Sequence, residues 1–257
     1  INTHNQYEYI QRCIESCLNQ NFLGKYEIIL VDTSKNKIQK FYKKFEKFKN
    51  LKFLKIEETS KYPCVNQFNS IKKAFNYSKG KIICIIDGDD FFNKNKLKFI
   101  NKYFSKKNFI NQDHPFKYIE NSKKKFLAKN NFLKKYKLYK MFINNWPDIY
   151  GTSCISINKL LLRKFFKKYN NKQFKYLAID TLLINFGNFK KCLFNKGNKL
   201  TYKSINLQNL DDTFSNKLSK KFWSRRSQQH VFIRNNFNKY LNLDYLFTQL
   251  ISLILRT

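Results

Sequence analysis

A short apolar run that ends in a cluster of acids constrains this chain more than any other stretch. The run is Ile82–Ile86, and it continues directly into Asp87-Gly88-Asp89-Asp90. An unbroken, largely β-branched run of this length predicts a strand buried on both faces, as in a parallel sheet covered by helices. Clustered carboxylates repel one another unless a cation lies among them, and Mg²⁺ or Mn²⁺ held by oxygen ligands usually also holds a phosphate. The alternative is a solvated Asp-Gly turn.

Buried-strand patterns and helical patterns alternate through the first hundred residues. We expect strands over 26–31, 51–56 and 82–86, and helices over 7–20, 38–48, 65–77 and 96–104. This alternation predicts an α/β fold with a doubly wound, mostly parallel sheet flanked by helices. Because parallel strands end at one edge, Asp32, Asp87 and Asp89 are expected at the same edge, where such sheets bind ligands.

The alternation breaks down after residue 110. We expect a strand over 151–157, a helix over 159–168, a helix starting near Asp180, a hairpin over 190–202 and basic helices from residue 211. The apolar end, Leu243 to Leu255, is too short to span a bilayer, which takes roughly 18 apolar residues or more. It could dock on the domain, pair with a partner or lie in a membrane interface.

The chain is strongly basic, with 51 Lys+Arg against 17 Asp+Glu and a formal net charge of +34. The excess is mostly Lys and is spread over nearly every segment, which favours an anionic substrate or surface over sequence-specific reading of nucleic acid. A basic nucleic-acid-binding protein is the alternative. It leaves the carboxylate cluster unexplained, because carboxylates repel phosphates unless a metal is present.

The cysteines and the N-terminus bear on where the protein works. The six cysteines form no Cys-x-x-Cys pair and no Cys/His cluster, and Cys13 and Cys17 lie one helical turn apart. This pattern favours reduced core thiols in a cytosolic protein over a zinc site. The sequence carries no secretory signal, and it begins with Ile1, which suggests a start inside a longer protein.

Three blocks in order resemble family 2 glycosyltransferases of the GT-A fold. The first runs from Asn2-Thr3-His4-Asn5 through the helix that ends at Gln20, and the second is 27–34 with Asp32 near its end. The third is Gly80 to Asp90, with the glycine, the strand and the Asp-x-Asp of the family. The resemblance is good over residues 2–105 and patchy beyond. It implies a GT-A fold (nucleotide-diphospho-sugar transferase, Rossmann-like) for residues 1–210, with a helical C-terminal extension over 211–257.

The resemblance also implies roles for individual residues. Residues 1–110 would form the nucleotide-sugar-binding half, with Thr3, Asn5 and Asp32 at the base and ribose of a donor that is most often a UDP-sugar. Asp87 and Gly88 would face the nucleotide sugar, and Asp89 together with Asp87 would hold Mg²⁺ or Mn²⁺. For Asp90, a supporting role and a cap on the next helix are equally open. The strand that precedes Asn2 in the family is missing here, so the sheet is expected to lack a strand.

The expected chemistry is metal-dependent and inverting, with the sugar passing to a glycan, lipid-linked or protein acceptor in cell-surface polysaccharide synthesis. Asp180 is the candidate base, although the first acid of the family's Glu-Asp pair is replaced by Ile179, and a helix-capping role is the alternative. Asp148 is the second candidate base, and Trp146 and Asp148 are candidates for the acceptor site in residues 111–210. Arg225 and Arg226 are candidates for the diphosphate.

The expected partners and location follow from the same resemblance and the basic surface. The partners are a nucleotide sugar and its acceptor, with no nucleic acid. A cytoplasmic location is expected, with peripheral association at the inner face of the membrane. Because Asp180 lacks its acidic neighbour, a catalytically inactive, transferase-like scaffold is a further alternative.

Overall fold

The computed structural model describes residues 1–35, 42–104, 108–119, 124–127, 147–170, 174–194, 197–205, 220–237 and 243–255. The expected helix over 38–48 falls partly outside this set; in its described part Tyr42 and Lys43 are helical and residues 44–47 form a turn. Trp146 also lies outside the described residues.

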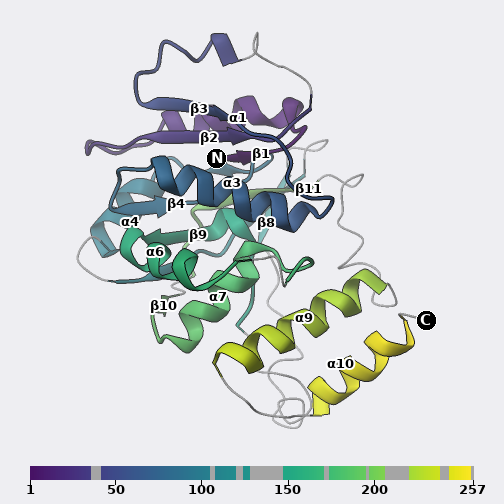
Figure 1. The fold of residues 1–257 in the computed structure, drawn as a ribbon. Coiled ribbons are helices and arrows are strands. Elements are labelled where there is room, and N and C mark those ends of the chain that lie inside the picture. Colours follow the sequence, from purple (N-terminus) through teal and green to yellow (C-terminus); the bar gives the residue numbers. More distant parts are fainter. Residues whose placement is uncertain are drawn as a thin grey trace.

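A central sheet with the strand order β3-β2-β1-β4-β9-β6-β10 forms the middle of the molecule (Figure 1). An isolated parallel bridge from Asn2 to Asp87 joins β1 to the chain that continues from β4. β9 runs antiparallel to both of its neighbours, and the other described pairs are parallel, which confirms the mostly parallel sheet. The strands are β1 (Asn2–Thr3), β2 (Ile28–Asp32), β3 (Leu51–Lys55), β4 (Ile82–Cys84), β6 (Ile110–Gln112), β9 (Ile155–Asn158) and β10 (Leu193–Phe194).

Helices cover both faces of this sheet and bury separate apolar clusters. On one face α3, α6, α7 and α9 pack over Ile85, Ile110 and Ile155. On the other face α1 packs over Leu30 and Ile86, and α4 packs over Cys84 and Phe109. Ile85 and Ile86 point to opposite faces because side chains alternate along an extended chain. The helices are α1 (Tyr7–Leu18), α3 (Pro63–Tyr77), α4 (Lys96–Phe104), α6 (Lys159–Lys168), α7 (Ile179–Phe189), α9 (Lys220–Asn236) and α10 (Leu243–Ile254).

A second, smaller sheet crosses the edge where the acids lie. Its order is β5-β11-β7-β8, and β11 pairs parallel to β7 and antiparallel to β5. The predicted hairpin over 190–202 is therefore wrong: Leu193 of β10 pairs with Ile110 in the central sheet, whereas Thr201 of β11 pairs with Phe92 in the second. The strands are β5 (Phe91–Phe92), β7 (Phe116–Ile119), β8 (Lys124–Leu127) and β11 (Thr201–Ile205).

Three further expectations need correction. The sheet does not lack its first strand position, because Asn2–Thr3 form β1 beside β2. The run after Lys81 is also less buried than predicted, since Ile82, Ile83 and Cys84 are half-buried while Ile85 and Ile86 are 5% and 1% exposed. The predicted strand over 151–157 begins later, after a 3₁₀ turn at Thr152–Cys154.

The C-terminal helices α9 and α10 pack side by side at the end of the molecule away from β3 (Figure 1). Arg226 on α9 donates to both carboxylate oxygens of Asp244 on α10, at 2.5 and 2.6 Å. Within the described part of the chain, no helix combines the length and hydropathy needed to cross a membrane.

Candidate functional site

The acidic cluster lies where β1 and the end of the β4 run meet. The N–H of Gly88 donates to the carbonyl of Asn2 at 2.8 Å, so this turn continues the ladder with β1. A side chain at Gly88 would lie 2.6 Å from Thr3 Oγ1 and 2.7 Å from Gln6 Oε1. The glycine of Asp-Gly-Asp is therefore required by the close approach of the chain that follows β1.

The acids of this turn are held by side-chain and backbone donors. Gln67 Nε2 donates to Asp87 Oδ1 at 3.0 Å, and the N–H of Asp87 donates to Ser153 Oγ at 3.0 Å. The side chain of Asp90 accepts the N–H of Ser204 in β11 at 2.9 Å. Asp90 thus ties the turn to the second sheet and does not cap α4, which begins six residues later at Lys96.

Burial and mutual repulsion raise the pKa values of these carboxyl groups. Burial, with a smaller effect of Asp89, raises the pKa of Asp87 to about 6. Burial, with smaller effects of Asp89 and Asp87, raises the pKa of Asp90 to about 7. The pKa of Asp89 is raised as well, mainly by burial. Charged carboxylates in such surroundings favour a cation among them, and this is the electrostatic signature of a site.

Lys203 on β11 supplies a positive charge to this cluster. Burial disfavours its charged form, but the carboxylates of Asp90, Asp87 and Asp180 act in the opposite direction and leave the pKa of Lys203 raised. Its side chain passes over Gly151, where φ is 105° and an added Cβ would lie 2.3 Å from Lys203 Nζ. Sequence analysis missed Lys203 because a lysine in a Lys-rich chain carries no signal of its own.

Asp32 forms a second polar centre at the same edge, at the end of β2. It is 1% exposed, and its Oδ1 accepts the N–H of Ser34 at 2.8 Å and the Ser34 hydroxyl, while Lys55 Nζ lies 3.4 Å from Oδ2. Ser34 Oγ in turn accepts the N–H of Asn5 at 2.7 Å. Asn5 has φ 53°, a left-handed conformation that Asn tolerates better than most residues.

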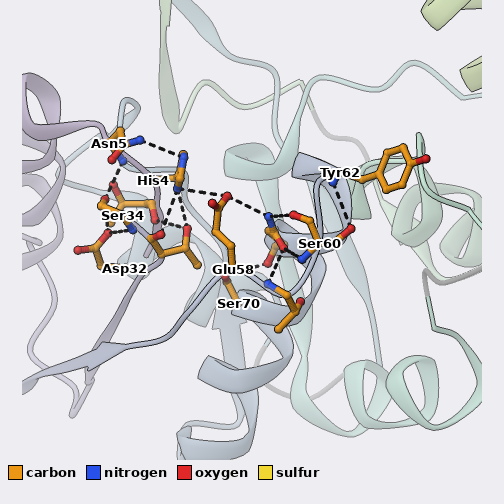
Figure 2. A network of polar contacts seen from close by, with 12 residues as sticks. His4, Asn5, Asp32, Ser34, Glu58, Ser60, Tyr62 and Ser70 are labelled. Carbon is orange, nitrogen blue, oxygen red and sulfur yellow. Dashed lines mark hydrogen bonds and ion pairs between the residues drawn. The ribbon is translucent and has the colours of Figure 1, made fainter. Parts of the chain in front are cut away.

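A polar network continues from this centre toward α3 (Figure 2). His4 Nδ1 lies 3.1 Å from Thr33 Oγ1 and 3.8 Å from Glu58 Oε1. Glu58 Oε1 accepts from the side chain of Asn66, a buried residue of α3, at 3.0 Å. The network fixes the loop after β1 against the ends of β2 and β3. Sequence analysis missed Glu58 and Asn66 because they lie in no motif.

The two candidate bases lie on different elements of the fold. Asp180 is in the first turn of α7, and its Oδ1 accepts the N–H of Thr181 at 2.6 Å. The carboxylate of Asp180 favours the charged form of Lys203, as the carboxylates of Asp87 and Asp90 do. Asp148 lies before β9, and its carbonyl accepts from Gln112 Nε2 at 2.6 Å.

The two candidate arginines lie on α9, and their side chains contact the elements that pack against this helix. Arg226 pairs with Asp244 and donates from Nε to Thr248 Oγ1 at 3.2 Å, and Arg225 Nε donates to the carbonyl of Tyr176 at 3.1 Å. These contacts join α9 to α10 and to the segment before α7, and they do not bring the arginines to the acidic turn.

The described residues contain no group of three or more His, Cys, Asp or Glu side chains arranged to hold a metal ion. A site of the Mg²⁺ type does not require one, because that ion commonly uses one or two carboxylates together with substrate phosphates and waters. Asp87 and Asp89, crowded and with raised pKa values, fit this description.

The comparisons with known proteins agree with this geometry. The family model "Glycosyl transferase family 2" matches residues 1–170. No curated protein matches the sequence. The fold resembles that of S. aureus TarS 1–349 in complex with UDP-GlcNAc, with 17% identity, a TM-score of 0.62, and coverage of 99% of this chain and 70% of that one.

Other solved structures show the same likeness. The complex of TarS 1–349 with UDP has 18% identity and a TM-score of 0.60, with coverage of 99% and 69%. Mannosyltransferase PcManGT from Pyrobaculum calidifontis, in complex with GDP-Man and Mn²⁺, has 11% identity and a TM-score of 0.57, with coverage of 99% and 68%. With the GT-A architecture and the family match over residues 1–170, the chain belongs to glycosyl transferase family 2 and is a glycosyltransferase.

Proposed function

We propose that this enzyme moves a sugar from a UDP-sugar to a hydroxyl of a glycan, lipid-linked or protein acceptor, with inversion at the anomeric carbon. The observation that carries the proposal is the acidic turn at the carboxyl edge of the sheet, where Gln67 and Ser153 contact Asp87 and Ser204 of β11 contacts Asp90. The acids of this turn suit a metal ion bound to a diphosphate. Lys203 adds a positive charge of the protein itself, and Asp180 of α7 adds a further carboxylate. Residues 1–110 would bind the donor, 111–210 the acceptor, and 211–257 would form an extension.

The donor would lie across the ends of β1, β2 and β4. Asp32, with Thr3 and Asn5, would contact the base and ribose, and Asp87 would face the ribose. A cation site at Asp89 and Asp87 would take Mg²⁺ or Mn²⁺ with the diphosphate. The ion, when bound, supplies positive charge that stabilises the leaving UDP. Lys203 would add a fixed positive charge beside it.

Asp180 would act as the base. Its carboxylate would take the proton of the acceptor hydroxyl while the hydroxyl oxygen bonds to the anomeric carbon and UDP leaves with the electron pair of the broken bond. Support comes from its place in the first turn of α7 and from its action on Lys203, which links it to the acids at the end of β4. Asp148 and Trp146 would belong to the acceptor side.

The proposal is tested by UDP release from UDP-GlcNAc and UDP-glucose, with GDP-mannose as a third donor, first with water as acceptor. Asp180→Asn should lower turnover by roughly 10²-fold or more, the usual contribution of a general base, and leave UDP affinity unchanged. Glu46→Gln, which removes an exposed acid away from the site, is the control and should retain turnover. UDP binding without turnover of any donor by the wild type would contradict the proposal and indicate an inactive scaffold.

We place the acceptor in cell-surface polysaccharide synthesis, at an anionic membrane face on the cytoplasmic side. Support comes from the net charge of +34 and from α10, which exposes an apolar face. Leu246, Leu250 and Leu253 are 53%, 59% and 66% exposed, whereas the polar Asp244 and Thr248 are buried against α9. A basic protein with such a face is suited to binding acidic headgroups.

A further inference from the structure

The side chain of Arg12 on α1 reaches both the acidic turn and the second sheet. Its Nη2 donates to the carbonyl of Asp89 at 3.1 Å and to Ser204 Oγ of β11 at 2.8 Å. The Ser204 hydroxyl donates to the same carbonyl of Asp89 at 2.5 Å. The three groups form a closed triangle of hydrogen bonds, which their hydrogens allow because Nη2 carries two and the hydroxyl carries one.

Two aromatic rings hold the guanidinium of Arg12 in place. Its Cζ lies 4.5 Å from the centroid of the Phe91 ring and 4.9 Å from that of Tyr118 in β7. The two rings meet edge to face, with their centroids 5.1 Å apart. Because Phe91 directly follows the turn, Arg12 contacts the chain on both sides of Asp90. Attraction to the ring faces and packing between them favour one position of the guanidinium.

These contacts depend on properties that arginine has and lysine lacks. A planar guanidinium can lie over a ring while its N–H groups donate in fixed directions, whereas a lysine ammonium is a compact, strongly hydrated point charge. Most of the 51 basic residues of this chain are lysines. The arginine at position 12 therefore suits a contact that the commoner basic residue would make less well.

The turn exposes two of its acids while its main chain is held. Asp87 and Asp89 are half-buried, whereas Asp90 is 2% exposed and its carboxylate accepts the N–H of Ser204. The carbonyl of Asp89, one residue earlier, accepts from both Arg12 and Ser204. Arg12 thus binds the main chain of the residue whose carboxylate is, with that of Asp87, proposed to hold a cation.

We propose that Arg12 is a positioning residue for the cation site of the donor. It fixes the main chain of Asp89 through the carbonyl, and so keeps the carboxylate of Asp89 grouped with that of Asp87. The inference rests on the proposed function, because it takes these two acids as the ligands of a cation that binds together with the diphosphate. Residues that orient metal ligands typically contribute roughly 10- to 100-fold to metal affinity.

The test measures UDP affinity by calorimetry with and without Mn²⁺ in the wild type, Arg12→Met and Arg163→Met. Methionine preserves apolar contact with Phe91 and removes the hydrogen bonds. Arg12→Met should lower UDP affinity in the presence of Mn²⁺ by about tenfold or more and leave the affinity without Mn²⁺ unchanged. Arg163→Met removes the same charge from an exposed position on α6 and should behave as the wild type.

Two further variants separate positioning from charge. Ser204→Ala keeps the guanidinium and removes the other donor to the Asp89 carbonyl, so it should also weaken the Mn²⁺-dependent binding. The double variant Arg12→Met/Ser204→Ala should lose less than the two single losses combined, because both residues act on one carbonyl. Arg12→Lys keeps the charge and should show a smaller loss in the same direction, and it serves as the test if Arg12→Met does not fold.

The outcomes distinguish this inference from the proposed function on which it rests. If the wild type binds UDP more tightly with Mn²⁺ and the Arg12 variants keep that difference in full, the positioning role is overturned and the proposed donor site stands. Losses that simply add in the double variant would also overturn it, since the arginine would then act independently of the carbonyl. A wild type whose UDP affinity does not depend on Mn²⁺ would overturn both.

Discussion

Lys203 shows how one half-buried lysine can favour several acids at a sheet edge. The carboxylates of Asp90, Asp87 and Asp180 oppose the effect of burial and favour its charged form. Gly151 leaves the space through which its side chain passes. Without Lys203, the acids would have to be neutralised by protons or by a bound cation.

Lys203→Met should destabilise the protein more at pH 8 than at pH 5.5. With pKa values of about 6 for Asp87 and about 7 for Asp90, both acids are charged at pH 8 and largely protonated at pH 5.5. We expect a loss of about 1–3 kcal/mol in the free energy of unfolding at pH 8, as for a lost charged partner, and a smaller loss at pH 5.5. Urea unfolding of the wild type and the variant at the two pH values measures this difference in the free energy of unfolding.

The control for this comparison is Lys199→Met, which removes an exposed lysine four residues earlier and should change stability little at either pH. An equal loss at both pH values for Lys203→Met would show that the lysine does not act through these carboxylates.

The residues of the site differed in how far the sequence could predict them. Asp87, Gly88 and Asp89 are contiguous and follow a buried run, so their grouping could be seen directly. Lys203 joins them only because β11 returns across the sheet edge and pairs with β5. Arg226 is a candidate for the diphosphate because a guanidinium suits bidentate phosphate contacts, and the sequence did not show that Arg226 also pairs with Asp244 on a later helix.

At the scale of elements, a fully buried ion pair joins α4 to both sheets. Lys96 Nζ donates to Asp113 Oδ1 at 2.8 Å, to Thr201 Oγ1 at 2.9 Å and to the carbonyl of Ser153 at 3.2 Å. Lys96 and Asp113 have fully buried side chains. Because Ser153 Oγ accepts the N–H of Asp87, this pair lies directly behind the acidic turn.

Lys96→Met should cost about 3–5 kcal/mol in the free energy of unfolding, because it leaves Asp113 buried without its partner. The double variant Lys96→Met/Asp113→Leu should recover part of that loss, since no charge is left unpaired. Lys98→Met, on the exposed side of the same helix, is the control for lysine removal. A loss under 1 kcal/mol for Lys96→Met would contradict a structural role for the pair.

Elements with a clear period were predictable, and elements defined by distant pairing were not. The helix predicted over 159–168 has the same bounds as α6, and α4 agrees equally well, because each carries its apolar residues at helical spacing. The hairpin over 190–202 was wrong, since two short strands that are close in sequence pair with different partners. Local patterning does not encode that choice.

At the scale of the whole molecule, positive charge and an exposed apolar helix occur together. The net charge of +34 was visible in the sequence, as was the apolar character of the last helix. The sequence did not show which face of α10 would be covered. The structure buries Asp244 and Thr248 and leaves Leu246 and Leu250 exposed.

We predict binding to vesicles that contain phosphatidylglycerol and weak binding to phosphatidylcholine alone, with the difference reduced by salt. The triple variant Leu246→Gln, Leu250→Gln, Leu253→Gln should lower the partition coefficient by tenfold or more, since burying one leucine contributes about 1.5–3 kcal/mol. Leu160→Gln, which changes a leucine that is 57% exposed on α6, is the control. Equal binding of the triple variant and the control in flotation would contradict a role for α10.

The central claim is a cation-dependent donor site at Asp87 and Asp89, and UDP binding measured by calorimetry tests it most directly. The wild type should bind UDP with Mn²⁺ at least tenfold more tightly than without it, and Asp89→Asn should lose this dependence. Glu57→Gln, which removes an exposed acid, is the control and should behave as the wild type. Folded protein that binds UDP equally with and without Mn²⁺, and whose affinity Asp89→Asn leaves unchanged, would contradict the account.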